Sequence, residues 1–437
     1  MRAARLSNLL LLAAMACAGA EDPEEILRQI KKNVSEQIAK SANYACTETL
    51  IRSYFRPITA LSAACGPASP PPQRKQFARD QLRLDVAVSK DAELYSWHGE
   101  NQFSSNRISD IVETGPISSG GFVGYLQNIF LGKGIEFTYT GTSSLNSKQL
   151  FNFDFVVSKE ASAYTILVGT EYQVVPFHGS FGASGGNFEL VTLKVVPDEI
   201  PFGSNMCSAE TEIHYQLAPI SGRDALIPES FQFTVDDDQH VDIVSRGQYQ
   251  QCHEFRSEST LRFDYSDAES HSGVLPAGIT ERVPAGVTLH LALTTPVNND
   301  NSYAGDPVDA VLLAPVKLPG ASGEIPRGAR VHGVITQFDS RLEPSEHFFL
   351  KIVFERITAA NKSYTLLAVH KPSGKELDKI TPLFGGIVPK PVMIKLNEGM
   401  MIIPGKRLDL DQRFKGEWRT VALASAAQVD TEAQKNN

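Results

Sequence analysis

Segments in which apolar and polar residues alternate recur along the first half of the chain. A period of two places every second side chain on the same face of an extended strand. One buried face and one solvated face are typical of antiparallel sheets. The clearest such segments are Leu82–Val88, Phe151–Phe155, Ile213–Leu217 and Phe231–Val235. They predict that this part of the chain folds into a curved antiparallel sheet.

Two segments in the same part of the chain have the period of a helix instead. Asp22 can cap a helix that begins with Pro23, because an acidic side chain accepts from free backbone N–H groups and proline suits the first turn. An apolar residue then recurs at every fourth position, at Ile26, Ile30, Val34 and Ile38. This stripe predicts a helix that lies on the sheet. A second helix is predicted over Gly121–Phe130, where the apolar residues fall on one face.

A turn-and-strand motif occurs twice in the second half of the chain. VPAGVTLHLAL (Val283–Leu293) returns with changes as IPRGARVHGVI (Ile325–Ile335), and each copy places proline near glycine before an apolar run. Proline fixes φ and glycine permits positive φ, so the pair makes a tight turn into a strand. Related pairs stand at Pro276–Gly278 and Pro404–Gly405. Many short strands that start at turns predict a closed barrel, since closure removes exposed edges.

Length and composition agree with two structural units. A chain of 437 residues is too long for one ordinary core, and 42% hydrophobic with 21% charged residues is typical of a globular protein. We predict a mainly β protein with an N-terminal curved antiparallel sheet (half-barrel), a few helices, and a small C-terminal β-barrel. The predicted ranges are 1–20 for a signal peptide, 21–263 for the half-barrel, 264–273 for a linker, 274–414 for the barrel and 415–437 for a flexible tail.

The N-terminus has the form of an export signal. Two arginines precede the short apolar run Leu9–Ala16, which small residues follow. We expect cleavage after Ala20 and a periplasmic protein. The alternative is a membrane-anchored protein lipidated at Cys17, because Ala14–Cys17 resembles a bacterial lipobox. No later segment is long and apolar enough for a transmembrane helix, so none is expected in the mature chain.

Cysteine usage indicates an oxidising compartment. Four cysteines follow the signal, Cys46, Cys65, Cys207 and Cys252, and an even count in an exported chain favours disulfides. We predict the pairs Cys46–Cys65 and Cys207–Cys252, because each pair then stays within one structural unit. Zinc is not expected, since no Cys-x-x-Cys motif occurs and the ten histidines are scattered. No metal or cofactor is predicted.

Three short motifs mark the C-terminal unit. They are Ala285-Gly286-Val287-Thr288-Leu289, Gly305-Asp306-Pro307-Val308-Asp309-Ala310-Val311, and Ile325-Pro326-Arg327-Gly328 with Gly333 beyond it. Together they resemble the outer-ring β-barrel module of TrbI-like conjugation and type IV secretion proteins. The chain departs from that family because no transmembrane helix precedes the module and no long apolar helix pair lies within it. The resemblance implies a fold, with self-association or envelope docking.

The N-terminal unit resembles the LolA/LolB-like lipoprotein carriers. Over Glu21–Phe263, an exported helix precedes an antiparallel sheet that is expected to curl around helices. The resemblance implies a concave apolar face able to hold acyl chains. Seven strand residues would line that face: Phe151, Phe153, Phe155, Ile213, Tyr215, Phe231 and Phe233. The alternative is that these side chains simply form the core.

Gly182-Ala183-Ser184-Gly185-Gly186 matches the Gly-x-Ser-x-Gly elbow of α/β-hydrolases. That elbow turns sharply from a strand into a helix and so presents the serine to a histidine base. Here a strand-like run follows the motif and no alternation of strands and helices surrounds it. A glycine-serine hairpin loop is therefore the preferred interpretation.

Three further groups of polar residues could indicate a metal or catalytic site, but a structural role is the preferred interpretation of each. Asp236-Asp237-Asp238 offers oxygens for calcium but separates two strand-like runs, which favours a solvated hairpin turn. Cys252 and His253 are neighbours in a strand, so they point to opposite faces and cannot act as a pair. His290 and His332 occupy equivalent places in the repeated motif, and a third ligand for a catalytic metal is missing. A structural or interface role is predicted for both histidines.

These features together predict a non-enzymatic protein of the bacterial cell envelope. The half-barrel is expected to bind an apolar or lipid-like ligand, a lipid or lipoprotein, and the barrel to dock an envelope partner or a second copy. The alternatives are a purely structural scaffold or secretion-associated component without a small ligand, and a serine hydrolase using Ser184. Nucleic acid is not an expected partner, because the net charge is −9 and no run of Lys or Arg occurs.

Overall fold

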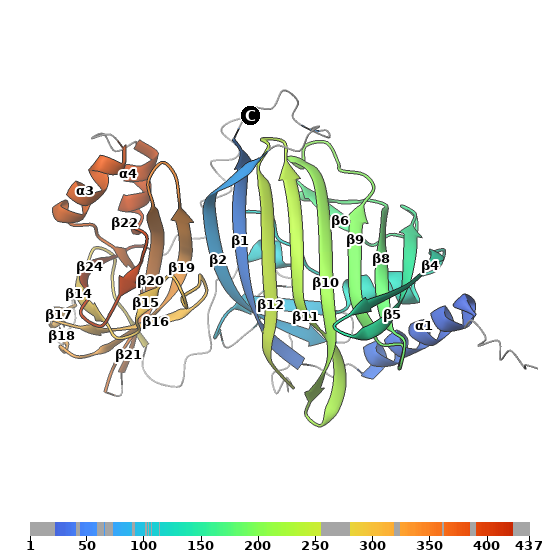
Figure 1. Ribbon diagram of the computed structural model, residues 1–437. Coiled ribbons are helices and arrows are strands. Elements are labelled where there is room, and N and C mark those ends of the chain that lie inside the picture. Colours follow the sequence, from blue (N-terminus) through green and yellow to red (C-terminus); the bar gives the residue numbers. More distant parts are fainter. Residues whose placement is uncertain are drawn as a thin grey trace, which may run out of the picture.

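The computed structural model shows two β units side by side (Figure 1). It describes residues 22–40, 44–58, 65, 73–89, 92–100, 103, 105, 107–112, 114–254, 280–318, 324–360, 362–384 and 390–422. The expected signal peptide with Cys17, the expected linker 264–273 and the turn at Pro276–Gly278 lie outside these residues. The predicted boundary between the two units, at residues 263 and 274, therefore stays a prediction.

The N-terminal unit is a curved antiparallel sheet. Its strands follow one another in the order β3, β2, β1, β12, β11, β10, β9, β8, β5, β4. The bounds are β1 Tyr44–Pro57, β2 Arg74–Ser89, β3 Ala92–Trp97, β4 Glu136–Leu145, β5 Lys148–Val157, β8 Phe177–Ser184, β9 Leu190–Pro197, β10 Met206–Ile220, β11 Arg223–Asp237 and β12 Asp242–Glu254. A separate hairpin joins β6 (Thr165–Val168) to β7 (Glu171–Val174). All four alternating segments of the sequence lie in these strands, which confirms the predicted sheet.

Helices cover the apolar face of this sheet. α1 (Pro23–Lys40) begins where predicted, and the backbone N–H of Glu24 donates to the Asp22 carboxylate at 3.1 Å. Its stripe of Ile26, Ile30 and Val34 is at most 2% exposed and belongs to the same core as the strands. The second predicted helix is short and consists of α2 (Gly124–Leu126) and the π-helical turn η2 (Gln127–Leu131). One 3₁₀ turn, η1 (Ile108–Asp110), precedes it.

The C-terminal unit is a closed antiparallel barrel. Each of its strands pairs with the next in the circle β14, β16, β19, β20, β21, β24 and back to β14. The bounds are β14 Thr288–Leu293, β16 Pro307–Leu312, β19 Arg330–Arg341, β20 His347–Ala359, β21 Lys362–His370 and β24 Lys415–Thr420. The large side chains Trp418, Ile352 and Leu289 are fully buried inside it. Strands make up more than half of the residues that the structure describes, which confirms the mainly β prediction.

The repeated motif forms the turns that precede β14 and β19. Gly286 and Gly328 have φ of +92° and +85°, a region that glycine enters without strain. The predicted start of the tail at Lys415 is wrong, because Lys415–Thr420 is the strand that closes the barrel between β14 and β21. Local pattern does not reveal this strand, since its partners are far away in sequence.

Short elements complete the barrel unit. They are β13 Thr280–Arg282, β15 Val297–Asn298, β17 Val316–Lys317, β18 Glu324–Ile325, β22 Met400–Pro404, β23 Asp409–Leu410, α3 Gly374–Ile380, η3 Thr381–Phe384 and α4 Lys390–Asn397. Ile380 of α3 and Leu396 of α4 pack with Met400 and Ile402 of β22 in a small second core. None of the helices within the described ranges is both long and apolar enough to cross a membrane.

The sheet and the barrel meet along β2, the strand of the sheet that faces the barrel in Figure 1. The register of β2 against β19 pairs Asp80 with Asp339, Arg79 with Ser340 and Ala78 with Arg341. A loop of the barrel also contacts β2, where the Ala304 N–H donates to the Gln81 carbonyl oxygen at 2.9 Å. Gly305 is required there, because a Cβ would lie 2.1 Å from the Arg83 carbonyl oxygen. The two units therefore share backbone pairing.

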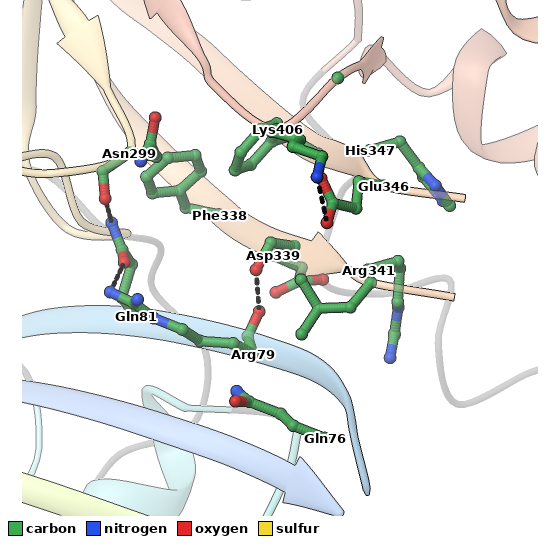
Figure 2. Close-up of a pocket in the computed structure, with 14 residues that line it drawn as sticks. Gln76, Arg79, Gln81, Asn299, Phe338, Asp339, Arg341, Glu346, His347 and Lys406 are labelled. Carbon is green, nitrogen blue, oxygen red and sulfur yellow. Dashed lines mark hydrogen bonds and ion pairs between the residues drawn. The ribbon is translucent and has the colours of Figure 1, made fainter. Parts of the chain in front are cut away.

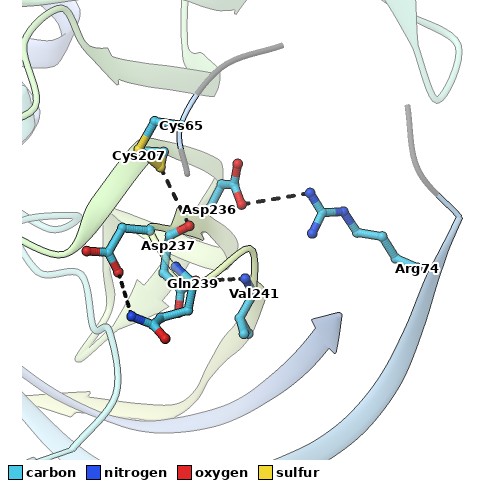
Figure 3. Close-up of a disulfide and its surroundings, with 8 residues drawn as sticks. Cys65, Arg74, Cys207, Asp236, Asp237, Gln239 and Val241 are labelled. Atoms are coloured by element: carbon cyan, nitrogen blue, oxygen red, sulfur yellow. Dashed lines mark hydrogen bonds and ion pairs between the residues drawn. A yellow bond between two sulfur atoms is a disulfide. The ribbon is translucent and has the colours of Figure 1, made fainter. Parts of the chain in front are cut away.

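Both disulfides lie in the N-terminal unit, but their pairing differs from the prediction. Cys46 bonds to Cys252, which ties β1 to β12, and Cys65 bonds to Cys207 at the start of β10 (Figure 3). The prediction of Cys46–Cys65 and Cys207–Cys252 is wrong because β1 lies between Cys46 and Cys65. A strand rises about 3.3 Å per residue, so β1 carries the chain to the opposite end of the sheet.

Candidate functional site

The seven residues predicted to line a ligand site come together on the inner face of the sheet. Each is at most 7% exposed, and all belong to one core with α1 and η2. Phe153 stacks on Phe181 with ring centroids 5.4 Å apart, and the Tyr215 hydroxyl donates to the Gly121 carbonyl oxygen at 2.7 Å. In this closed arrangement the seven side chains contact protein on all sides.

A crevice runs beneath α1, next to these residues. Asn33 and Val34 of α1 line it from one side, and Leu190, Leu217 and Leu226 from the sheet. It is too narrow to hold a water molecule. Any ligand that reaches the inner face therefore requires α1 or its neighbours to move.

Residues 114–131, which we name the covering segment, lie over the inner face beside α1. A carboxylate of the sheet holds the middle of this segment. Glu93 on β3 accepts hydrogen bonds from the backbone N–H groups of Gly120, Phe122 and Val123 at 2.9, 3.0 and 3.0 Å. It also accepts from the Tyr95 hydroxyl at 2.5 Å. One side chain thus fixes four donors.

A buried ion pair holds the start of the covering segment. The Arg52 guanidinium, 2% exposed, makes two hydrogen bonds to the Asp80 carboxylate at 2.8 and 3.0 Å and donates to the Thr114 carbonyl oxygen at 2.6 Å. Tyr54 donates to the same carboxylate at 2.8 Å. Coulombic attraction to Asp80 and the hydrogen bonds outweigh the effect of burial and raise the pKa of Arg52. Arg52 is therefore charged and directly connects the segment to β2.

A second acidic side chain lies in the same interior without a full set of partners. Glu48 on β1 is 1% exposed, and its Oε1 has no hydrogen-bond partner among the described residues. Burial, and secondarily the charge of Glu93, raise the pKa of Glu48 from 4.5 to about 8. Glu48 pairs in register with Tyr249, whose pKa burial also raises. A strongly shifted buried acid in an aromatic interior is typical of a functional site, although structural networks have the same effect.

A cavity of about 260 Å³ lies at the junction of the two units (Figure 2). From the sheet, β2 contributes Gln76, Arg79 and Gln81. From the barrel come the end of β19, the start of β20 and the residues after β22, together with Asn299. The full barrel lining is Asn299, Phe338, Asp339, Ser340, Arg341, Leu342, Glu346, His347, Phe348, Gly405 and Lys406.

The junction cavity combines apolar rings with charged groups. Phe338 and Phe348 stack with centroids 6.3 Å apart, and Lys406 lies 3.8 Å from the Glu346 carboxylate. Burial, and also the charge of Asp80, raise the pKa of Asp339. Burial lowers the pKa of His347. The cavity can therefore hold a small ligand that has both a polar and an apolar part.

Ser184 lies in a hairpin and lacks the surroundings of a nucleophile. It ends β8, and a turn leads from it directly into β9. Its hydroxyl donates to the Asn187 side-chain oxygen, a residue of the same turn, and the Phe188 N–H donates to the Ser184 carbonyl oxygen at 2.9 Å. The preferred interpretation as a hairpin loop is therefore confirmed at this position.

Asp236 and Asp237 end β11 (Figure 3), and Asp238 begins the turn that leads to β12. Asp237 accepts hydrogen bonds from the backbone N–H groups of Gln239 and Val241 at 2.9 and 2.7 Å. Arg74 pairs with Asp236 and Asp242 on either side. In the described part of the chain no cluster of three or more His, Cys, Asp or Glu has a geometry that holds a metal.

The repeated histidines are separate in space, as β16 lies between their strands. His290 is half exposed, 3.8 Å from the Glu417 carboxylate. His332 contacts Asp309 through Nδ1 at 2.7 Å and Thr358 through Nε2 at 3.0 Å. Cys252 is in a disulfide, so it offers no thiol beside His253.

Sequence reasoning missed Glu48, Arg52 and Glu93. One signal was present in β1. Every second residue from Tyr44 onward, including Leu50, points to the inner face, and Glu48 and Arg52 lie at such positions. A charged residue at an inward position of a strand indicates a buried pair or a site. No comparable signal marks the junction cavity, since its residues come from distant segments.

No protein-family model matches the sequence. A comparison with curated proteins also finds no match. Among solved structures, a DUF1329 family protein from Desulfovibrio piger is similar at 8% identity and a TM-score of 0.26, covering 55% of this chain and 95% of that chain. A putative outer membrane lipoprotein-sorting protein domain from Vibrio parahaemolyticus is similar at 9% identity and a TM-score of 0.28, with the same coverage. Likenesses this weak assign neither a family nor an activity, and the TrbI-like resemblance stays a prediction.

Proposed function

We propose that this protein is a non-enzymatic component of the bacterial cell envelope that binds an apolar, lipid-like ligand in the half-barrel. The inner face with Phe151, Phe153, Phe155, Ile213, Tyr215, Phe231 and Phe233 would hold the ligand. The barrel would dock an envelope partner or a second copy. Two disulfides support an oxidising compartment, because they persist outside the cytoplasm.

The observation that carries the proposal is how the inner face is closed. α1 and the covering segment lie over it without joining the sheet by strand pairing. Side chains hold them instead, chiefly the apolar stripe of α1, Glu93 and Arg52. Contacts of this kind open at a lower free energy than a central strand does. Displacing both elements would expose a continuous apolar surface that suits an acyl chain.

Organic extraction of the protein purified from a periplasmic fraction tests the proposal. Mass spectrometry of the extract is expected to show a lipid in near-stoichiometric amount. A clean extract, together with no uptake of a fluorescent fatty acid, contradicts it.

A pair of matched variants tests whether α1 is the gate. Ile30→Ala weakens the contact of α1 with the sheet, whereas Ile352→Ala makes a similar hole in the barrel; both isoleucines are fully buried. Each change costs about 2–5 kcal/mol of stability. Only Ile30→Ala is expected to speed the uptake of a fluorescent fatty acid. Equal rates in both variants contradict a gate at α1.

The closely packed interior favours a second candidate function, a scaffold without a small ligand. The crevice under α1 is too narrow for water, and the seven side chains are already covered. For a scaffold, we expect a clean extract and a complex with envelope proteins that is retained after chemical crosslinking.

A further inference from the structure

The junction cavity contains a cation whose surroundings are incomplete. Arg79 extends from β2, and its Nη2 donates to Gln81 Oε1 at 2.8 Å. Its Nε is buried and has no hydrogen-bond partner, and no described carboxylate lies within 4.0 Å of its guanidinium. A buried N–H of a charged group without an acceptor costs more than an ordinary unmade hydrogen bond. The site therefore lacks an acceptor.

The other charged groups of the lining do not supply this acceptor. Lys406 and Glu346 form their own pair. Asp339 accepts a hydrogen bond from Gln337 at 2.5 Å. Figure 2 shows the side chain of Arg79 running toward Gln81, while Arg341 lies at the opposite end of the lining. Arg79 is thus left to interact with whatever enters the cavity.

The barrel holds Arg79 in place. Gln81 Nε2 donates to the Asn299 carbonyl oxygen at 3.4 Å and also to the Ser302 carbonyl oxygen, so Gln81 is fixed by a barrel loop. The Ser340 hydroxyl donates to the Arg79 carbonyl oxygen at 3.3 Å. A guanidinium whose direction is fixed in advance loses little entropy when it binds an anion.

We propose that the junction cavity binds the oxyanion of a small amphipathic molecule, with its carboxylate or phosphate on the Arg79 guanidinium. The guanidinium N–H groups that Gln81 does not take would donate to such an anion, and a hydrogen bond between two charged groups is stronger than one between neutral groups. Phe338 and Phe348 supply an apolar wall for the rest of the ligand. At about 260 Å³ the cavity is smaller than most sites for drug-sized ligands, which favours a short-chain carboxylate or a phosphate monoester. The ligand contacts both units, so its binding stabilises their arrangement. This site is separate from the inner face of the half-barrel.

Isothermal titration calorimetry of the mature chain at low ionic strength tests the proposal, with inorganic phosphate and butyrate as probes. Arg79→Gln is expected to weaken binding by about tenfold or more, since a hydrogen bond to a charged group is lost. Arg79→Lys keeps the positive charge but loses the planar guanidinium group. Its affinity for the anion is expected to lie between those of Arg79→Gln and the unchanged protein. Lys406→Met, a second change in the lining, is expected to weaken binding less.

Arg246→Gln is the matched control, because it removes the same charge from an exposed position on β12. Its affinity is expected to equal that of the unchanged protein. A second arm measures sedimentation with phosphatidylglycerol vesicles. Binding to vesicles that depends on Arg79, without binding of free anions, assigns the anion to a lipid headgroup and supports the site. The proposal is overturned if neither probe nor vesicles bind, or if Arg79→Gln and Arg246→Gln bind equally well.

Discussion

The half-barrel and the barrel are both antiparallel and both have buried cores, but they are closed in different ways. In the barrel, each strand pairs with two neighbours and β24 completes the circle. In the half-barrel, the inner face is closed by α1 and the covering segment, which side chains hold in place. Three of these side chains are charged: Arg52 and Asp80 are buried, and Glu93 is partly buried. Opening the barrel would break backbone pairing, whereas opening the half-barrel would break side-chain contacts, and contacts of the second kind open at a lower free energy.

The two tryptophans allow the two units to be followed separately. Trp97 lies on β3 of the half-barrel and Trp418 on β24 of the barrel. The Trp418→Phe background therefore follows the half-barrel together with its contact with Gly305 of the barrel, next to which Trp97 lies, and the Trp97→Phe background follows the barrel. Arg52, Asp80 and Glu93 lie in the half-barrel. The comparison therefore predicts that changing them lowers the stability followed by Trp97 more than the stability followed by Trp418.

The largest effect is expected for Arg52→Met. The change leaves the Asp80 carboxylate buried without its partner and frees the Thr114 carbonyl oxygen. Breaking a buried pair from one side costs about 3–5 kcal/mol. Urea unfolding followed by Trp97 is expected to show this loss, and the double variant Arg52→Met/Asp80→Leu to recover part of it. If both tryptophan signals shift equally, the contrast between the units fails.

A pH-dependent effect is expected for Glu48→Gln. The folded protein raises the pKa of Glu48 to about 8, so the stability contributed by the protonated acid is present below 4.5 and is lost as the pH rises to about 8. Across that window the unchanged protein loses roughly 1 kcal/mol per pH unit relative to the variant. Melting temperatures at pH 5 and pH 9 check this. A constant difference at both values would show that Glu48 does not titrate there.

A smaller loss of stability is expected for changes at the two repeated turns of the barrel, and the loss is expected to be the same at both turns. Gly286→Ala and Gly328→Ala each force a side chain into a positive φ, while nothing within 4 Å obstructs the new Cβ. The cost is the backbone strain alone, about 1–3 kcal/mol. Gly124→Ala, at a helical position with equally open space, is the control and is expected to cost nothing. Thermal unfolding measures all three variants, followed by Trp418 for the two barrel turns and by Trp97 for Gly124→Ala.

The smallest effect is expected for His290→Ala. His290 is half exposed, and exposed pairs such as His290 with Glu417 contribute at most about 1 kcal/mol. Stability is therefore expected to change by less than about 0.5 kcal/mol. A light-scattering measurement of the oligomeric state in the same variant tests the predicted interface role. An unchanged mass in both proteins leaves His290 as an ordinary surface residue.

The sequence by itself determined the local elements. Alternation located the strands that contain Leu82, Phe153, Ile213 and Phe231, and the stripe of α1 located the helix on the inner face. These predictions succeeded because side-chain periodicity is set by the geometry of a single strand or helix. The same periodicity placed all seven predicted lining residues on the buried face, although it did not distinguish a core from a ligand site.

Only the tertiary structure decided which distant segments meet. The disulfide of Cys46 with Cys252, the closing strand at Lys415–Thr420 and the cavity around Arg79 each join residues far apart in the chain. The physical reason is that strand pairing sets register over the whole sheet, and it brings side chains together that no local pattern connects. The side chains that close the half-barrel are a further example. The role of Glu93 follows only from the distant backbone N–H groups that donate to it, which the sequence around Glu93 does not indicate.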